Sequence, residues 1–232
     1  MYYVTYLEMF FGIATYHLFN YYLRNEKMNI SEHWAFQKGI LVHNAALCVY
    51  SGWSFIETAK VLSQYSIAYL FSDNVAVLLT SDRYKQLLYY FYLSKYWEFI
   101  DTWIHFVKGR EPSFLQVFHH TGAVLMIGTG IYHEVACVWL FVTFNSFVHT
   151  LMYGYYALSC MKIKVPYKQL LTSVQIVQLV SANTLGWYYF FFTDMPMKDR
   201  ILLSLSTGYI LGLVNMFVLF YNKSYVNRIK SE

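Results

Sequence analysis

The feature of this sequence that most constrains its fold is a series of long stretches without Asp, Glu, Lys or Arg. A stretch of about 20 mostly apolar residues is enough for an α-helix to cross the hydrocarbon core of a bilayer. Residues 1–23 contain only one of these four residue types, Glu8. Five further stretches contain none, namely 39–56, 112–133, 135–161, 169–193 and 201–222. The pattern therefore predicts six membrane-spanning helices.

A seventh span is predicted at 86–107, which is apolar and aromatic but carries Lys95, Glu98 and Asp101. With it, the 232 residues form a single transmembrane domain, and the fold class is an all-α integral membrane protein with seven transmembrane helices. The expected spans are 2–23, 38–58, 86–107, 113–131, 135–157, 167–191 and 201–222.

Composition supports this class and excludes others. Hydrophobic residues make up 57% of the chain and charged residues 13%, whereas soluble domains are about 45–50% apolar and about 25% charged. A soluble monomer, a disordered chain and a disulfide-stapled secreted module are therefore excluded. The net charge of +4 is too small to indicate a nucleic-acid partner.

The distribution of basic residues predicts the orientation in the membrane. Cytoplasmic loops carry an excess of Lys and Arg. With seven spans, 11 of the 17 Lys and Arg fall on one side, five on the other, and Lys95 within a span. This asymmetry favours a lumenal N-terminus and a cytosolic C-terminus. Residues 61–81 are then a lumenal loop or a re-entrant segment, because an eighth span would remove the bias.

Polar residues are concentrated in four of the predicted spans. An ionisable side chain costs about 2.5–3.5 kcal/mol at the centre of a membrane, so it needs a partner or a function. In each of the four spans, the polar residues follow helical spacing and so lie on one face of the helix. In each span they also lie in the half of the helix that is predicted to be cytosolic. This common depth predicts a reaction chamber that opens to the cytosol above an apolar tunnel. The residues are Lys95, Glu98, Asp101, Thr102 and His105; Gln116, His119 and His120; Asn145, His149, Met152 and Tyr153, followed by Tyr156; and Thr172, Gln175 and Gln178.

Three interpretations of this set are open from the residues alone. An imidazole can act as a nucleophile toward a thioester, and nearby carboxylates can orient it. Gln116, His119 and His120 also look like one histidine box of the membrane di-iron fatty-acid desaturases and hydroxylases, which need about three such boxes. A seven-span carrier or receptor without chemistry is the third interpretation, although no inverted repeat with broken helices is visible.

Four motifs resemble those of the ELO family of very-long-chain fatty-acid elongases, in the family's order. Residues 95–102 match KxxExxDT, and residues 145–156 match NxxxHxxMYxYY. Residues 172–178 match TxxQxxQ, and residues 116–120 match the histidine box, with Gln116 where His is more common. The sequence is thus identified as similar to 3-oxoacyl-CoA synthases.

The resemblance implies a fold and a reaction. The fold is a six-helix barrel around an acyl tunnel, with the first helix peripheral. The reaction condenses acyl-CoA with malonyl-CoA to 3-oxoacyl-CoA, CO2 and CoA through an acyl-histidine intermediate. The expected catalytic residues are His119 as nucleophile, His120, His149, Asp101 and Glu98. The expected substrate-binding residues are Lys95, Gln116, Asn145, Met152, Tyr153, Tyr156, Thr172, Gln175 and Gln178.

The resemblance also implies partners and a location. The substrates acyl-CoA and malonyl-CoA are expected with no cofactor and no metal. The protein should be a multi-pass protein of the endoplasmic reticulum membrane, working beside a 3-ketoacyl-CoA reductase, a dehydratase and an enoyl-CoA reductase. A homodimer is a further option.

Overall fold

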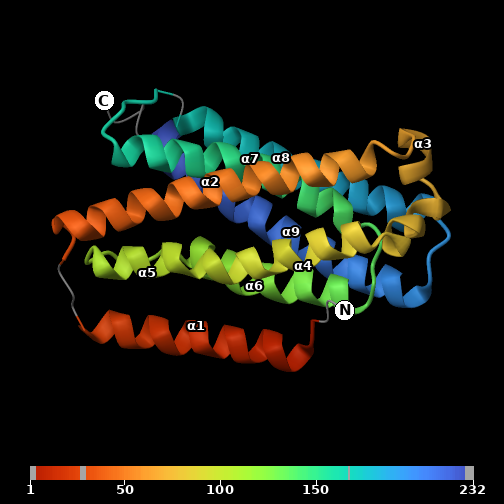
Figure 1. The fold of residues 1–232 in the computed structure, drawn as a ribbon, viewed down its shortest axis with the longest axis horizontal. Coiled ribbons are helices and arrows are strands. Elements are labelled where there is room, and N and C mark those ends of the chain that lie inside the picture. Colours follow the sequence, from red (N-terminus) through yellow and green to blue (C-terminus); the bar gives the residue numbers. More distant parts are fainter. Residues whose placement is uncertain (1–3, 27–29, 167, 228–232) are drawn as a thin grey trace.

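The computed structural model describes residues 4–26, 30–166 and 168–227, and in this part of the chain every regular element is a helix. Figure 1 shows the long helices running side by side along the longest axis of the molecule. The α-helices are α1 (Tyr6–Glu26), α2 (Trp34–Leu62), α3 (Ile67–Leu70), α4 (Asp82–Trp97), α5 (Phe99–Val107), α6 (Phe114–Tyr132), α7 (Val138–Cys160), α8 (Lys168–Phe192) and α9 (Met197–Tyr221). A 3-10 helix, η1 (Asp73–Thr80), precedes α4, and a π-helical turn, η2 (Asn222–Val226), follows α9.

The all-α class is confirmed. Three helices of the described chain are long and apolar enough to cross a membrane: Trp34–Leu62, Phe114–Tyr132 and the continuous helix Met197–Val226. They coincide with the second, fourth and seventh predicted spans. The other four spans stay predictions. Helices α1, α7 and α8 cover three of them, and α4 and α5 together cover the fourth. The first residues of spans 2–23 and 167–191 lie outside the described part.

Residues 61–81 do not form an eighth long helix. This segment holds α3, of four residues, and η1, of eight. Ser66 and Ser72 cap these two short helices by accepting backbone N–H groups at Tyr69 and Asn74. Since both are far shorter than a bilayer crossing requires, the segment is a structured connection between α2 and α4.

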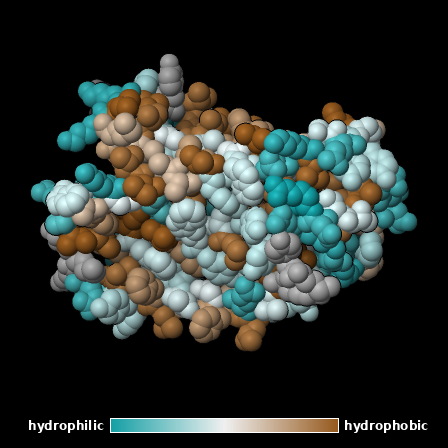
Figure 2. Space-filling view, in the orientation of Figure 1, coloured by the Kyte–Doolittle hydropathy of each residue, from teal (hydrophilic) through white to brown (hydrophobic). Residues whose placement is uncertain are grey.

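Successive long helices alternate in direction along the long axis (Figure 1). Neighbouring pairs include α2 with α7, α7 with α8, α8 with α9, α9 with α6, α6 with α4, and α4 with α2. Helix α1 packs against α5 and α6 at the lower edge of the view. Figure 2 shows hydrophilic residues gathered toward the ends of this axis, with pale and hydrophobic residues between them. This banding fits a bilayer that surrounds the middle of the molecule.

Helices α2 and α7 pack closely through small side chains. The Ser146 hydroxyl donates to Ser54 Oγ at 3.1 Å, and Cys48 Sγ donates to the Thr150 carbonyl at 3.3 Å. A Cβ at Gly154 would lie 3.4 Å from Cys48 Sγ. Small residues allow helix backbones to approach in this way. The contact aligns the polar face of α7 with α2.

The predicted helix 86–107 is divided at Glu98. Helix α4 ends at Trp97 and α5 begins at Phe99, with an i to i+3 bond from Asp101 N–H to the Glu98 carbonyl at 3.1 Å. The expected single stripe is therefore divided as well. Thr102 Oγ1 lies 2.9 Å from the Tyr16 hydroxyl of α1, whereas Lys95 and Glu98 contact α7.

Candidate active site

A buried cluster forms where the α4–α5 junction faces α7. Lys95 Nζ donates to Glu98 Oε1 at 2.6 Å and to Asn145 Oδ1 at 2.9 Å. Glu98 Oε1 also lies 3.2 Å from His149 Nδ1, without the alignment of a hydrogen bond, so this contact is electrostatic. All four residues are at most 6% exposed. Because Lys95 holds the Asn145 oxygen, the Asn145 Nδ2 group is left to donate elsewhere.

A second cluster joins α2, α5 and α7 around Asp101. His43 Nε2 lies 2.7 Å from Asp101 Oδ1, and the Tyr153 hydroxyl donates to Asp101 Oδ2 at 2.5 Å. Asp101 therefore pairs with an imidazole, as predicted for a carboxylate in this site, but the imidazole is His43. Sequence reasoning left His43 outside the site. Its position as an ionisable residue inside the uncharged stretch 39–56 was the signal for including it.

The adjacent histidines of α6 face different surroundings. The His119 ring lies 6.4 Å from the His149 ring, centroid to centroid, and Tyr209 of α9 donates its hydroxyl to the His119 carbonyl at 2.9 Å. The His120 ring stacks with Tyr16 and Phe99, each 6.3 Å away. Among the described residues, His120 Nδ1 has no hydrogen-bond partner. His119 thus faces the buried cluster, and His120 faces α1 and α5.

The remaining predicted residues surround these clusters at different distances. Gln175 Nε2 lies 3.3 Å from Met152 Sδ, which joins α8 to α7. Gln178 is buried, and its Nε2 has no partner in the described chain. Thr172 Oγ1 contacts the Tyr225 hydroxyl at 3.2 Å.

Two more predicted residues lie toward the margin of this region. Tyr156 is 39% exposed, with its ring 6.1 Å from that of Tyr153. Gln116 lies in the first turn of α6, where its N–H bonds to Ser113 Oγ. The structure thus brings Lys95 and Glu98 into contact with Asn145 and His149, and Asp101 into contact with Tyr153. It leaves Gln116 and Tyr156 further out.

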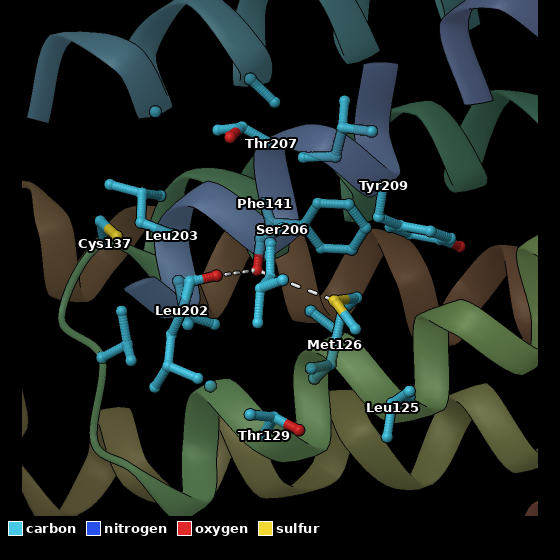
Figure 3. Close-up of a pocket in the computed structure, with 18 of the residues that line it drawn as sticks. Leu125, Met126, Thr129, Cys137, Phe141, Leu202, Leu203, Ser206, Thr207 and Tyr209 are labelled. Atoms are coloured by element: carbon cyan, nitrogen blue, oxygen red, sulfur yellow. Dashed lines mark hydrogen bonds between the residues drawn. The ribbon is translucent and has the colours of Figure 1, made fainter. Parts of the chain in front are cut away.

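An apolar cavity of about 290 Å³ lies between α6, α7, α8 and α9. Figure 3 shows Leu125, Met126 and Thr129 of α6 across from Leu202, Ser206 and Tyr209 of α9. The wall also includes Ala123, one helical turn after His119 and His120, and at the other end of α6 it includes Val135, Cys137 and Tyr6. Ser206, a polar residue of the wall, donates its hydroxyl to the Leu202 carbonyl. The cavity therefore runs away from the histidines and presents mainly hydrocarbon surface.

In the described residues, the side chains that could bind a metal ion occur in pairs and not in larger groups. No group of three or more His, Cys, Asp or Glu in this part of the chain is placed to hold a metal ion. One carboxylate–imidazole pair, Glu98 with His149, instead lies beside the imidazole of His119. A second pair, Asp101 with His43, is connected to His149 through Tyr153. Such an arrangement can orient a nucleophile and move protons.

Comparison with known proteins shows which family has these motifs. The family model described as ELO, the GNS1/SUR4 family, matches residues 2–232. The chain belongs to the ELO family. All four motif segments of this ELO protein lie within the matched region, and they lie on α4, α5, α6, α7 and α8.

Curated relatives carry names from the same family. Fatty acid elongase A of Dictyostelium discoideum is 27% identical over 192 residues, which is 80% of this chain and 71% of the relative. Fatty acid elongase sre1 of the same organism is 31% identical over 62% of this chain and 54% of the relative. Very long chain fatty acid elongase 5 of Tachysurus fulvidraco is 29% identical over 81% of this chain and 66% of the relative. This ELO protein thus spans about half to two thirds of the length of the last two.

Proposed function

We propose that this protein is a fatty-acid elongase that condenses acyl-CoA with malonyl-CoA to 3-oxoacyl-CoA, CO2 and CoA. The observation that carries the proposal is the continuity of two features. The His119 and His149 imidazoles of α6 and α7 lie together beside the Glu98 carboxylate, and an apolar cavity begins one turn further along α6. A fatty acyl thioester has the matching form, since it joins a reactive carbonyl to a long hydrocarbon chain. The names of the relatives support the same reaction class.

His119 is the proposed nucleophile. It lies beside His149 and one turn before the cavity, whereas His120 is packed against Tyr16 and Phe99. A lone pair of the His119 imidazole attacks the thioester carbonyl carbon, and the C–S bond breaks as CoA leaves with the electron pair. The imidazole loses its N–H proton, which balances the proton taken up by the CoA thiolate. The product of this first step is an acyl-imidazole.

The second step forms the new carbon–carbon bond. Malonyl-CoA loses CO2, and the electron pair of the broken C–C bond is left on the α-carbon of an enolate. This carbon attacks the acyl-imidazole carbonyl, and the C–N bond breaks with its electron pair on the ring nitrogen. That nitrogen takes up a proton, which restores the neutral His119 imidazole. No external oxidant or reductant enters the balance, in agreement with a reaction that uses its two CoA substrates and no cofactor.

Stabilisation of the developing negative charge is assigned to amide groups. Lys95 holds the Asn145 oxygen and so directs Asn145 Nδ2 toward other acceptors, and Gln178 Nε2 is buried without a partner in the described chain. Donors fixed before the reaction are effective at an oxyanion. The sequence motif implies that Tyr153 binds substrate. Its hydroxyl proton is instead donated to Asp101, so Tyr153 is assigned a different function.

The acyl chain is proposed to occupy the cavity of Figure 3. The neighbour relations support an enclosed chain, because α2, α7, α8, α9, α6 and α4 form a closed cycle of packed pairs with α1 outside it. This cycle is the proposed six-helix barrel. In a seven-span layout the histidines lie in its cytosolic half and the cavity in its lumenal half.

The proposed setting is the endoplasmic reticulum membrane with a lumenal N-terminus and a cytosolic C-terminus. Lys108, Arg110, Lys162 and Lys164 lie in the connections at the histidine end and are proposed to meet the phosphates of CoA. The reductases and dehydratase of the elongation cycle are the proposed enzyme partners.

The test separates the first step from the second. Purified protein given an acyl-CoA without malonyl-CoA should release CoA and carry an acyl group on the peptide that contains His119, detected by mass spectrometry. His119→Ala should abolish CoA release and product, and His120→Ala should retain the acyl adduct on His119. Full elongation by His119→Ala would overturn the assignment, and oxygen-dependent desaturation by iron-loaded protein would favour the di-iron alternative.

A further inference from the structure

His43 is a buried ionisable residue that the proposed chemistry does not use. It lies on α2, outside the four family motifs, and is 8% exposed. An ionisable side chain within a membrane helix needs a specific partner or function. Its partner is Asp101, at 2.7 Å.

Asp101 is held from two sides by two other helices. His43 of α2 contacts Oδ1, and Tyr153 of α7 donates to Oδ2. With each oxygen engaged, the orientation of the carboxylate is set, and the direction of the Tyr153 O–H bond is set with it. Loss of the His43 contact leaves Oδ1 unpaired and the carboxylate free to turn.

Tyr153 connects this cluster to the reacting imidazoles. Its ring centroid lies 5.5 Å from that of His149, and the His149 centroid lies 6.4 Å from that of His119. A tyrosine hydroxyl that donates to a carboxylate can still accept a hydrogen bond from a second donor. The Tyr153 oxygen is thus held beside His149 as an acceptor, by a carboxylate that His43 fixes.

We infer that His43 is a positioning residue for the condensation reaction, acting through Asp101 to fix the Tyr153 hydroxyl beside His149. The inference rests on the proposed elongase function and adds to it a residue outside the recognised motifs. His43 does not contact the His119 ring; its neighbours include Asp101 and the rings of Trp97 and Tyr153.

The packing of α2 in the bundle does not depend on the His43–Asp101 contact alone, which joins α2 to α5. Ser54 with Ser146, and Cys48 with the Thr150 carbonyl, join α2 to α7 further along α2. A purely structural function of His43 would therefore resemble that of Ser54. This similarity makes Ser54→Ala a matched control, since it removes a buried hydrogen bond that α2 makes to a neighbouring helix.

The experiment compares kcat and KM of full-length variants in detergent, for protein recovered from the monodisperse size-exclusion peak. His43→Leu should lower kcat about tenfold or more while the KM for acyl-CoA changes by less than about twofold, because positioning and not binding is lost. His43→Gln should recover most of the loss, since its Nε2 can donate to Asp101 Oδ1. Ser54→Ala should keep the kcat of the unmodified protein.

A comparison of single and double variants provides a second measurement, which remains informative if one variant folds poorly. If His43 acts through Asp101, the double variant His43→Leu/Asp101→Asn should have the same kcat as Asp101→Asn alone. A kcat for His43→Leu equal to that of Ser54→Ala, or a His43→Gln variant as slow as His43→Leu, would overturn the inference. Absence of elongation by the unmodified protein would instead overturn the proposed function on which it rests.

Discussion

Lys95 Nζ lies 2.6 Å from Glu98 Oε1, and both side chains are almost completely buried at the α4–α5 junction. Removing one partner of a buried ion pair leaves an uncompensated charge, which costs about 3–5 kcal/mol. We therefore expect Lys95→Met to lower the melting temperature strongly. The double variant Lys95→Met/Glu98→Gln should recover a large part of the loss, because neither charge is then present.

The control for this prediction is Lys85→Met on the same helix. Lys85 pairs with Glu134 at 3.2 Å, and both side chains are substantially exposed. Exposed pairs contribute about 0–1 kcal/mol, so thermal unfolding monitored by tryptophan fluorescence should change little. Equal effects of Lys95→Met and Lys85→Met would contradict the importance of burial.

Asn145 is predicted to affect chemistry more than stability. If its Nδ2 group stabilises the oxyanion, Asn145→Asp should lower kcat about 10²–10³-fold, because the side chain keeps its size and loses the donor. The measurement is initial-rate product formation from acyl-CoA and malonyl-CoA. Thr143→Ala is the control on α7, since the Thr143 hydroxyl donates to the Trp139 carbonyl of its own helix. Normal turnover by Asn145→Asp would exclude the amide as the donor.

Gly122 provides a test of the connection between cavity and nucleophile. A Cβ at this position would collide with the ring of Tyr209, whose hydroxyl bonds to the His119 carbonyl. Gly122→Ala should displace Tyr209 and lower elongation activity. Gly208→Ala of α9 is the matched control, because nothing lies within 4 Å of its added Cβ. It should keep activity and, as a helix-interior Gly→Ala change, gain up to about 1 kcal/mol of stability. Equal activity of the two variants would argue against the connection.

Tyr6 is predicted to limit the length of the acyl chain. It lines the cavity at the end distant from the histidines, and its hydroxyl lies 2.9 Å from His133 Nε2. Tyr6→Ala removes an aromatic ring from this end, so the longest product made from a graded panel of acyl-CoAs should become longer. Tyr6→Phe keeps the ring and should keep the product profile. An unchanged profile for Tyr6→Ala would show that this end of the cavity does not bound the chain.

Local patterns predict which residues of the same helix lie together. Lys95 and Glu98 are three residues apart, which places them together on one side of a helical turn. Asn145, His149 and Tyr153 are four apart each time, and all three are buried on α7. No such pattern predicts the break between α4 and α5 at Glu98, because no Pro or Gly marks it. The break lies where the two helices pass between α1 and α7.

The helical class, the apolar stretches and the helix faces that carry polar groups follow from residue type and a period of 3.6 residues, so the amino-acid pattern is enough to predict them. The pairing of Asp101 with His43, 58 positions earlier, and the approach of His119 rather than His120 to His149 follow from no such pattern. These choices depend on which helices are neighbours and how closely they approach. The small residues between α2 and α7 bring His43 toward the site, and the packing of α1 on α5 and α6 holds His120 against Tyr16 and Phe99.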